Sequence, residues 1–201
     1  AISRGLRVSS ARGILRPALK NKNIKLILNA RVTKILFDGK IAKSINLVRA
    51  RNGELTTIAA RKEIIISAGA VNTARLLQVS GLGPKNYLKD LGVDLIKNIE
   101  GVGNNLIDHY GARMVMKANP TYTTLNELSK GPRLGLQIAK WAVGLPNILA
   151  LVPSQVFLFC KSNPDIDFAD LQCVFTPGSY KEGKHYVLDD YPGVTGGWWQ
   201  H

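Results

Sequence analysis

The chain has 201 residues, of which 45% are hydrophobic and 20% charged. This composition is typical of a globular protein with a sizeable core and one or two domains. No apolar run is long enough to cross a bilayer, so no transmembrane segment is expected. Two cysteines, Cys160 and Cys173, do not make a disulfide framework. We therefore expect a cytoplasmic protein, with peripheral membrane association left open.

The positive charge is concentrated in the first third of the chain. Residues 1–62 hold 15 Lys or Arg against Asp38 and Glu54, whereas residues 63–201 hold 12 of each sign. Three interpretations stay open: a solvated surface, a surface for polyanions, or a surface that complements a cofactor phosphate and an acidic partner. Phe37 is the only aromatic residue before Tyr87, which leaves few stacking partners for bases. We therefore expect no nucleic-acid binding.

From residue 9 to residue 67 the pattern predicts a helix followed by a meander of strands. Ser9 and Ser10 are candidate N-caps of the helix, which Pro17 should kink or shift. Asp38-Gly39 and Asn52-Gly53 predict tight turns between strands. The predicted strands are residues 24–28, 31–37, 41–49, 55–59 and 61–67, the last of them buried on both faces.

A strand–turn–helix unit follows the meander. The end of the last predicted strand runs into the small-residue turn Ala68-Gly69-Ala70, and a helix is predicted over residues 71–79. The sequence Ser-Gly-Leu-Gly-Pro at residues 80–84 ends this helix. Such a unit directs backbone amides at whatever lies above the strand end, which suits an anionic cofactor.

Beyond residue 110 the composition changes, and we place a domain boundary there. The pattern predicts strands at residues 113–117, 155–160 and 170–175 and helices at residues 125–128 and 134–143, with a break at Gly131-Pro132. Residues 178–201 are rich in Gly, Tyr and Trp. Trp198 and Trp199 are expected to pack rather than to stack on a substrate.

Two glycine pairs, Gly81/Gly83 and Gly101/Gly103, do not complete a dinucleotide fingerprint and by themselves indicate turns. His109 alone is compatible with a base, a ligand group or a structural histidine. The acidic pairs Asp165/Asp167 and Asp189/Asp190 do not indicate acid–base chemistry. No residue pattern indicates a metal site.

Taken together, nine pieces in order resemble the glucose–methanol–choline (GMC) family of flavin oxidoreductases. The likeness is close over residues 7–109 and looser over residues 110–201. Its pieces are Arg-Val-Ser-Ser-Ala at residues 7–11, Leu-Arg-Pro-Ala at 15–18, residues 24–28 with Ala-Arg-Val at 30–32, Phe-Asp-Gly at 37–39, Lys-Glu-Ile-Ile-Ile-Ser-Ala-Gly-Ala at 62–70, Ser-Gly-Leu-Gly-Pro at 80–84, Leu-Gly-Val at 91–93, Gly-Val-Gly at 101–103, and Asn-Leu-Ile-Asp-His at 105–109.

The resemblance implies a fold and a cofactor. The fold would be α/β with mixed α+β character, in which residues 1–109 form part of an FAD-binding, Rossmann-like domain. Residues 110–201 would form part of a substrate-binding domain with an antiparallel sheet. The FAD-binding residues implied are Val32 at the adenine end, Ala68, Gly69 and Ala70 in the turn, and Asn72, Asn105 and Asp108. Asp108 would act as a structural hydrogen-bonding residue, and His109 would line the active-site cavity.

The implied reaction is oxidation of the CH–OH group of a small-molecule alcohol, with hydride transfer to FAD. The electron acceptor stays unnamed. No catalytic residue is implied in this chain, because the family's initial Gly-x-Gly-x-x-Gly motif and its final histidine base have no counterpart here. We expect a central part of a longer polypeptide, inactive by itself. Choline-oxidising members carry Glu where this chain has Gly111, which argues against choline. The alternatives are a basic polyanion-binding module or an inert interaction domain.

Overall fold

The computed structural model describes residues 2–3, 6–152, 154–184 and 187–200. The chain divides into two compact units, which we call the central unit (Lys25–Ile107) and the flanking unit (Ala1–Ile24 with Asp108–His201). The predicted boundary at residues 109/110 lies close to the end of the central unit. Residues 1–24, however, group with the C-terminal part of the chain and not with the predicted first domain. The assignment of FAD-binding and substrate roles to two domains stays a prediction.

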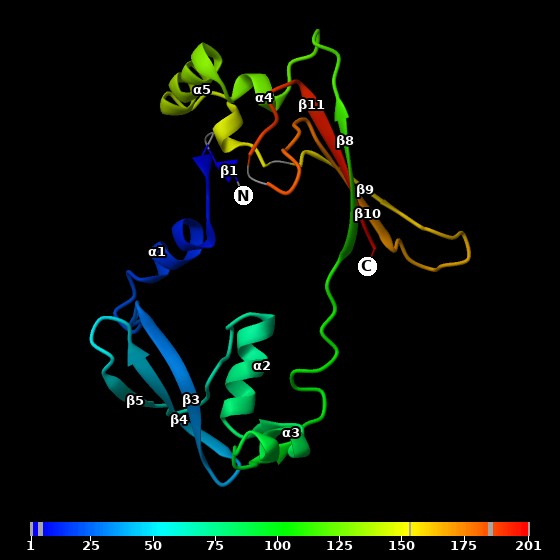
Figure 1. The fold of residues 1–201 in the computed structure, drawn as a ribbon. Coiled ribbons are helices and arrows are strands. Elements are labelled where there is room, and N and C mark those ends of the chain that lie inside the picture. The colour runs from blue at the N-terminus through cyan, green and yellow to red at the C-terminus, as the bar shows by residue number, and fades with distance from the viewer. Residues whose placement is uncertain (1, 4–5, 153, 185–186, 201) are drawn as a thin grey trace. The chain divides into compact units, whose positions relative to one another are not determined.

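The central unit is built on a three-stranded antiparallel meander in the order β3-β4-β5 (Figure 1). Its strands are β3 (Ala30–Asp38), β4 (Ile41–Arg49) and β5 (Leu55–Ala59), and they confirm three of the predicted strands. The two predicted tight turns connect them. Ile35 and Leu47 are only 3% exposed each and form the core of this sheet.

One helix lies against this meander. Helix α2 (Ala70–Val79) confirms the predicted helix and contacts β3 (Figure 1). Ser80 joins the two elements, because its Oγ accepts a hydrogen bond from the Ile35 amide at 2.9 Å and donates to the Leu76 carbonyl at 2.6 Å. The end of α2 is thereby fixed to the middle of β3.

After α2 the chain forms a small parallel pair. Strand β6 (Leu82–Gly83) pairs with β7 (Lys97–Asn98), and α3 (Lys85–Asp90) lies between them in the sequence. Leu88 of α3 is fully buried. From β7 the chain continues into the loop at residues 99–107.

Two predicted strands of this unit are wrong. Residues 24–28 and 61–67 adopt no strand, and Ile65, expected in a doubly buried strand, is 79% exposed. A strand needs a neighbour for its backbone hydrogen bonds, and no described segment pairs with either stretch. Apolar, β-branched sequence alone therefore does not make these residues a strand.

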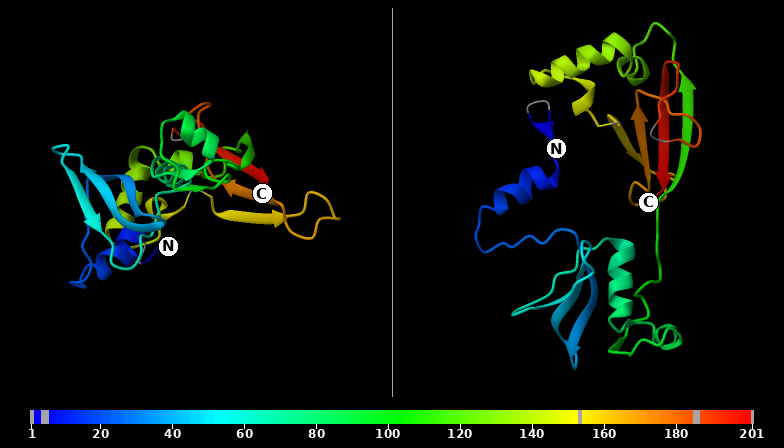
Figure 2. Two further views of the ribbon diagram at one scale, coloured as in Figure 1. Left: turned by 90° about the horizontal axis from the view of Figure 1, so that it is seen from below. Right: turned by 60° about the vertical axis from the view of Figure 1, so that its left-hand side comes forward.

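The flanking unit is built on a four-stranded antiparallel sheet in the order β8-β11-β10-β9 (Figure 2). Its strands are β8 (Tyr110–Lys117), β9 (Val156–Cys160), β10 (Leu171–Thr176) and β11 (Gly193–Gln200). The sequence predicted β8, β9 and β10 but not β11. The sequence of β11, Gly-Val-Thr-Gly-Gly-Trp-Trp-Gln, contains three glycines that lower its strand propensity. It forms a strand nevertheless, because it pairs with β8 on one side and with β10 on the other.

Helices complete the flanking unit. The predicted helices are confirmed as α4 (Leu125–Leu128) and α5 (Gly131–Ala142), followed by η2 (Ile148–Ala150). Near the N-terminus, β1 (Ile2–Ser3) pairs with β2 (Leu6–Arg7), and η1 (Ala11–Leu15) runs into α1 (Arg16–Ala18). η1 is a π-helical turn that ends two residues before Pro17, which has no amide hydrogen to donate to the α-helical ladder. None of the described helices has the length and apolar character needed to cross a membrane.

Candidate functional site

The turn before α2 depends on Gly69. Its backbone has φ 83° and ψ 170°, a region that is essentially restricted to glycine. Gly69 is also the N-cap of α2, so no side-chain oxygen caps the helix. The first backbone amides of a helix have no intrahelical acceptor and carry partial positive charge. The small residues at 68–70 leave this end of α2 open to a ligand.

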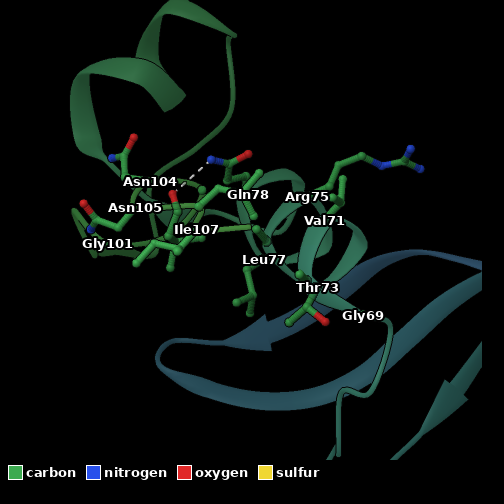
Figure 3. A pocket seen from close by; sticks show the side chains of 15 residues that line it. Gly69, Val71, Thr73, Arg75, Leu77, Gln78, Gly101, Asn104, Asn105 and Ile107 are labelled. Carbon is green, nitrogen blue, oxygen red and sulfur yellow. Dashed lines mark hydrogen bonds between the residues drawn. The ribbon is translucent and has the colours of Figure 1, made fainter. Parts of the chain in front are cut away.

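A first pocket of about 690 Å³ lies between one side of α2 and the loop at residues 101–107 (Figure 3). The side-chain amide of Gln78 donates a hydrogen bond to the Val102 carbonyl at 3.1 Å and so joins helix and loop. The side-chain amide of Asn104 donates to the Glu100 carbonyl at 2.7 Å, which braces the loop itself. Gly69, Ala70 and Asn105, all predicted cofactor residues, line this pocket.

A second pocket of about 550 Å³ lies between another side of α2 and the start of β3. Val32, Ala68 and Asn72, the other predicted cofactor residues of the central unit, line it. Arg31 and Arg75 line it as well, and its described lining includes no carboxylate. The structure thus gathers six of the predicted residues into two pockets on one helix, and Arg75 lines both pockets.

Asp108 and His109 belong to the flanking unit. The Asp108 carboxylate accepts a hydrogen bond from the backbone amide of its neighbour His109 at 2.8 Å. Its predicted part in cofactor binding stays a prediction. His109 lines a third pocket, of about 360 Å³, within the flanking unit. This pocket brings His109 together with Trp199, Phe157 and Gln172, which sequence reasoning missed. The sequence of β11 does not alternate in polarity, so its two adjacent tryptophans gave no sign of which one lines this pocket.

The carboxylates with clearly shifted pKa values lie outside these three pockets. Hydrogen bonds from the Ser162 side chain and backbone hold the pKa of Asp170 below its usual range. Lys181 at 2.8 Å and Lys130 at 3.2 Å lower the pKa of Asp190. These contacts brace loops of the flanking unit. They do not form a catalytic acid–base pair.

The comparisons with known proteins agree on one family. Residues 2–111 match the model of the GMC oxidoreductases. The oxygen-dependent choline dehydrogenase of Staphylococcus saprophyticus is 36% identical over 179 residues, which are 88% of this chain and 31% of that protein. The namesake from Brucella ovis is 35% identical over 187 residues, or 91% of this chain and 33% of that protein.

A solved structure gives the same result for the fold. A variant of the Aspergillus oryzae RIB40 formate oxidase, studied for its FAD modification, matches with a TM-score of 0.83 at 18% identity. The match covers 99% of this chain and 38% of the oxidase. The chain belongs to the GMC oxidoreductase family, and it spans about a third of the length of the curated relatives it matches.

Replacing Gly69 by Ala is expected to lower the free energy of unfolding of the central unit by about 1–3 kcal/mol, because alanine must adopt a strained backbone there. A Cβ at this position meets nothing within 4 Å, so the cost is conformational and not steric. Circular dichroism during urea unfolding measures it. Gly135→Ala in α5 is the matched control, since it fills equally open space without positive φ and should be neutral or stabilising. Equal effects of the two changes would contradict the strain at Gly69.

Proposed function

We propose that this chain provides cofactor- and substrate-binding surfaces of an FAD-dependent oxidoreductase that acts on the CH–OH group of an alcohol. One observation carries the proposal: six residues predicted to bind the cofactor line two pockets on opposite flanks of one helix, next to its uncapped N-terminus. The family assignment and the FAD described for the formate oxidase support it. The names of the choline dehydrogenases support an alcohol as substrate.

The central unit fits such a cofactor in size and chemistry. Its two pockets, of about 690 and 550 Å³, lie in the range of small-molecule sites. Val32, Ala68 and Asn72 would hold the adenine end of FAD, and Arg31 and Arg75 would offset the charge of its phosphates. Gly69 and Ala70 keep the approach to the α2 amides free of bulky side chains. When bound, FAD supplies the hydride acceptor of the reaction.

The residues of the flanking unit would act on the alcohol. The hydrogen bond from the His109 backbone amide to the Asp108 carboxylate would hold the backbone just before β8. It would thereby help to position His109, which lines the third pocket. His109 would orient the substrate. The base that takes the hydroxyl proton is, in this proposal, a histidine outside residues 1–201.

A charge introduced into the second pocket tests the proposal. In the purified protein that carries this sequence, Val32→Glu is expected to weaken FAD binding at least about tenfold, or about 1.4 kcal/mol, because the carboxylate repels the phosphates. Quenching of FAD fluorescence or calorimetric titration measures the dissociation constant.

Ile58→Glu is the matched control. Ile58 of β5 is 36% exposed, as is Val32, and it lines none of the three pockets described above. This change should alter FAD affinity less than about twofold. A protein that binds no FAD, or equal losses in the two variants, would contradict the proposal.

A further inference from the structure

Two cysteines lie side by side on one face of the flanking sheet. Cys160 of β9 pairs with Leu171 of β10, and Leu158 of β9 pairs with Cys173 of β10. Directly paired residues share a face of a sheet, and so do residues two apart along a strand. Cys160 and Cys173 are therefore diagonal neighbours on the same face of two adjacent strands. They are the only cysteines of the chain.

The two thiols interact, and they differ in reactivity. Burial raises the pKa of the Cys173 thiol, and its hydrogen bond with Cys160 and the negative charge of the Cys160 thiolate raise this pKa further. The thiolate is the nucleophilic form of cysteine, so a raised pKa makes Cys173 the poorer nucleophile. Cys160 is thus expected to react first, with Cys173 beside it as the partner.

This face of the sheet is open to small solutes. Both cysteines are half-buried rather than buried. The residues that pair with Cys173 on its two sides, Leu158 and Trp198, are 58% and 37% exposed. An oxidant as small as hydrogen peroxide therefore has access to the sulfur atoms, which a cysteine enclosed in a core does not offer.

The diagonal arrangement determines how stable a bond between the two sulfur atoms would be. Diagonal neighbours on adjacent strands have Cα atoms about 7–8 Å apart, whereas most disulfides join Cα atoms about 4.4–6.8 Å apart. A disulfide here would therefore draw the two strands together and be strained. β9 can make this movement, because it is the edge strand and pairs only with β10 in the described part of the chain. Strained disulfides are the easily reduced ones.

We propose that Cys160 and Cys173 form a reversible disulfide when the protein meets a peroxide, and that this bond clamps the edge strand β9 to β10. The inference does not depend on the proposed function. A disulfide of this kind is not a permanent structural framework. Transient disulfides serve as redox sensors in reducing compartments, where permanent ones are rare.

The chemistry needs the peroxide as its oxidant. The Cys160 thiolate attacks one oxygen of hydrogen peroxide, so that an S–O bond forms, the O–O bond breaks and hydroxide leaves. The Cys173 sulfur then attacks the sulfur of this sulfenic acid, which forms the S–S bond and breaks the S–O bond. The protons of both thiols end in water. In sum, two thiols and one hydrogen peroxide give one disulfide and two water molecules.

The bond would act on the wall of the third pocket. Phe157 of β9 and Val174 of β10 pair with each other and line that pocket, on the face of the sheet opposite the cysteines. A covalent link on one face would thus fix the spacing of two strands that supply side chains on the other. The clamp would make this part of the pocket more rigid.

Treatment of the purified protein with hydrogen peroxide, followed by mass spectrometry of its peptides, tests the disulfide. The expected product is an intramolecular link between Cys160 and Cys173, with the loss of two hydrogen atoms, and reduced glutathione should restore both thiols. Oxidation to sulfinic or sulfonic acid without a link, or a link that reduced glutathione leaves intact, would overturn the inference.

Serine variants test the order of reaction. In Cys173→Ser, Cys160 should lose its thiol to peroxide within about twofold of the wild-type rate. In Cys160→Ser, Cys173 should react at least about threefold more slowly. Leu158→Ser is the matched control, since it changes the same sheet face but keeps both thiols, and it should still form the disulfide. Equal rates in the two cysteine variants, or no disulfide in the wild type and the control, would count against this mechanism.

Hydrogen–deuterium exchange tests the clamp separately. The oxidised protein should exchange the amides of residues 156–160 at least about tenfold more slowly than the reduced protein, because the link opposes fraying of the edge strand. The meander β3-β4-β5 of the central unit is the internal control and should not change. A disulfide that forms without slowing exchange in β9 would contradict the clamp.

Discussion

Replacing Asn126 by Leu is expected to lower the free energy of unfolding of the flanking unit by at least about 2 kcal/mol. Asn126 is 1% exposed. Its side-chain amide donates to the Ser179 carbonyl at 3.0 Å and to the Asp189 carbonyl at 3.1 Å, and its Oδ1 accepts from the Ser179 amide at 2.9 Å. Leucine has similar size but leaves the buried Ser179 amide without a partner, at a cost of about 1–3 kcal/mol. It also removes one hydrogen bond from each of the two carbonyls, which keep the Asp189 amide and the Lys130 ammonium group as donors.

The change also tests what holds β11 in place. Asn126 fixes the loop at Ser179, and the Ser179 side chain fills the space beside Gly193, the first residue of β11. All three tryptophans of the chain lie in the flanking unit, so tryptophan fluorescence during denaturant unfolding reports on this unit. Asn163→Leu, in an exposed turn, is the control and should cost less than about 1 kcal/mol. A loss below about 1 kcal/mol for Asn126→Leu would contradict the proposed role of this network.

Gly81→Ala is expected to destabilise the central unit by more than about 3 kcal/mol, since it combines two costs. Gly81 has φ 92°, and a Cβ would lie 2.5 Å from the Asp94 carbonyl oxygen and 2.7 Å from Cγ1 of Ile96. The Gly81 carbonyl also accepts hydrogen bonds from the Ile96 and Lys97 amides at 2.8 and 3.2 Å. An added methyl group would therefore push apart the β6–β7 pair, which leads to the loop of the first pocket.

Gly92→Ala separates the two costs. Gly92 has φ 66°, but nothing lies within 4 Å of an added Cβ, so only the left-handed backbone is penalised, by about 1–2 kcal/mol. Circular dichroism during urea unfolding compares the two variants. Equal losses would show that the close approach to Asp94 and Ile96 does not matter, contrary to the packing described here.

Sequence patterns correctly predicted the helices and strands that pack against elements adjacent to them in the sequence. The meander β3-β4-β5 could be predicted because its tight turns fix the pairing of strands that alternate in polarity. Helix α2 could be predicted because its apolar residues recur at helical spacing and Ser80-Gly81 ends it. The strand predicted at residues 61–67 is wrong, because a run of isoleucines indicates burial but does not show whether a neighbouring strand is present to pair with it.

The candidate site was predictable in part, for a related reason. Local turn chemistry indicated Gly69 and its neighbours, and the resemblance to a family indicated Val32. The third pocket depends on β11, a strand that was not predicted because of its glycines. It also depends on the pairing of β11 with β8, which places Trp199 opposite Gly111 although the two residues are far apart in the sequence. Gly111 illustrates the difference: its absence of a side chain is visible in the sequence, but the indole that requires this absence is visible only in the structure.

Hydrogen–deuterium exchange of the purified protein with and without FAD tests the central claim most directly. FAD should slow amide exchange at residues 30–33, 68–76 and 101–107, which line the two pockets on α2, and leave β5 unchanged. Slowing confined to other segments, or no change on adding FAD, would contradict the claim that this helix and its two pockets form a flavin-binding surface.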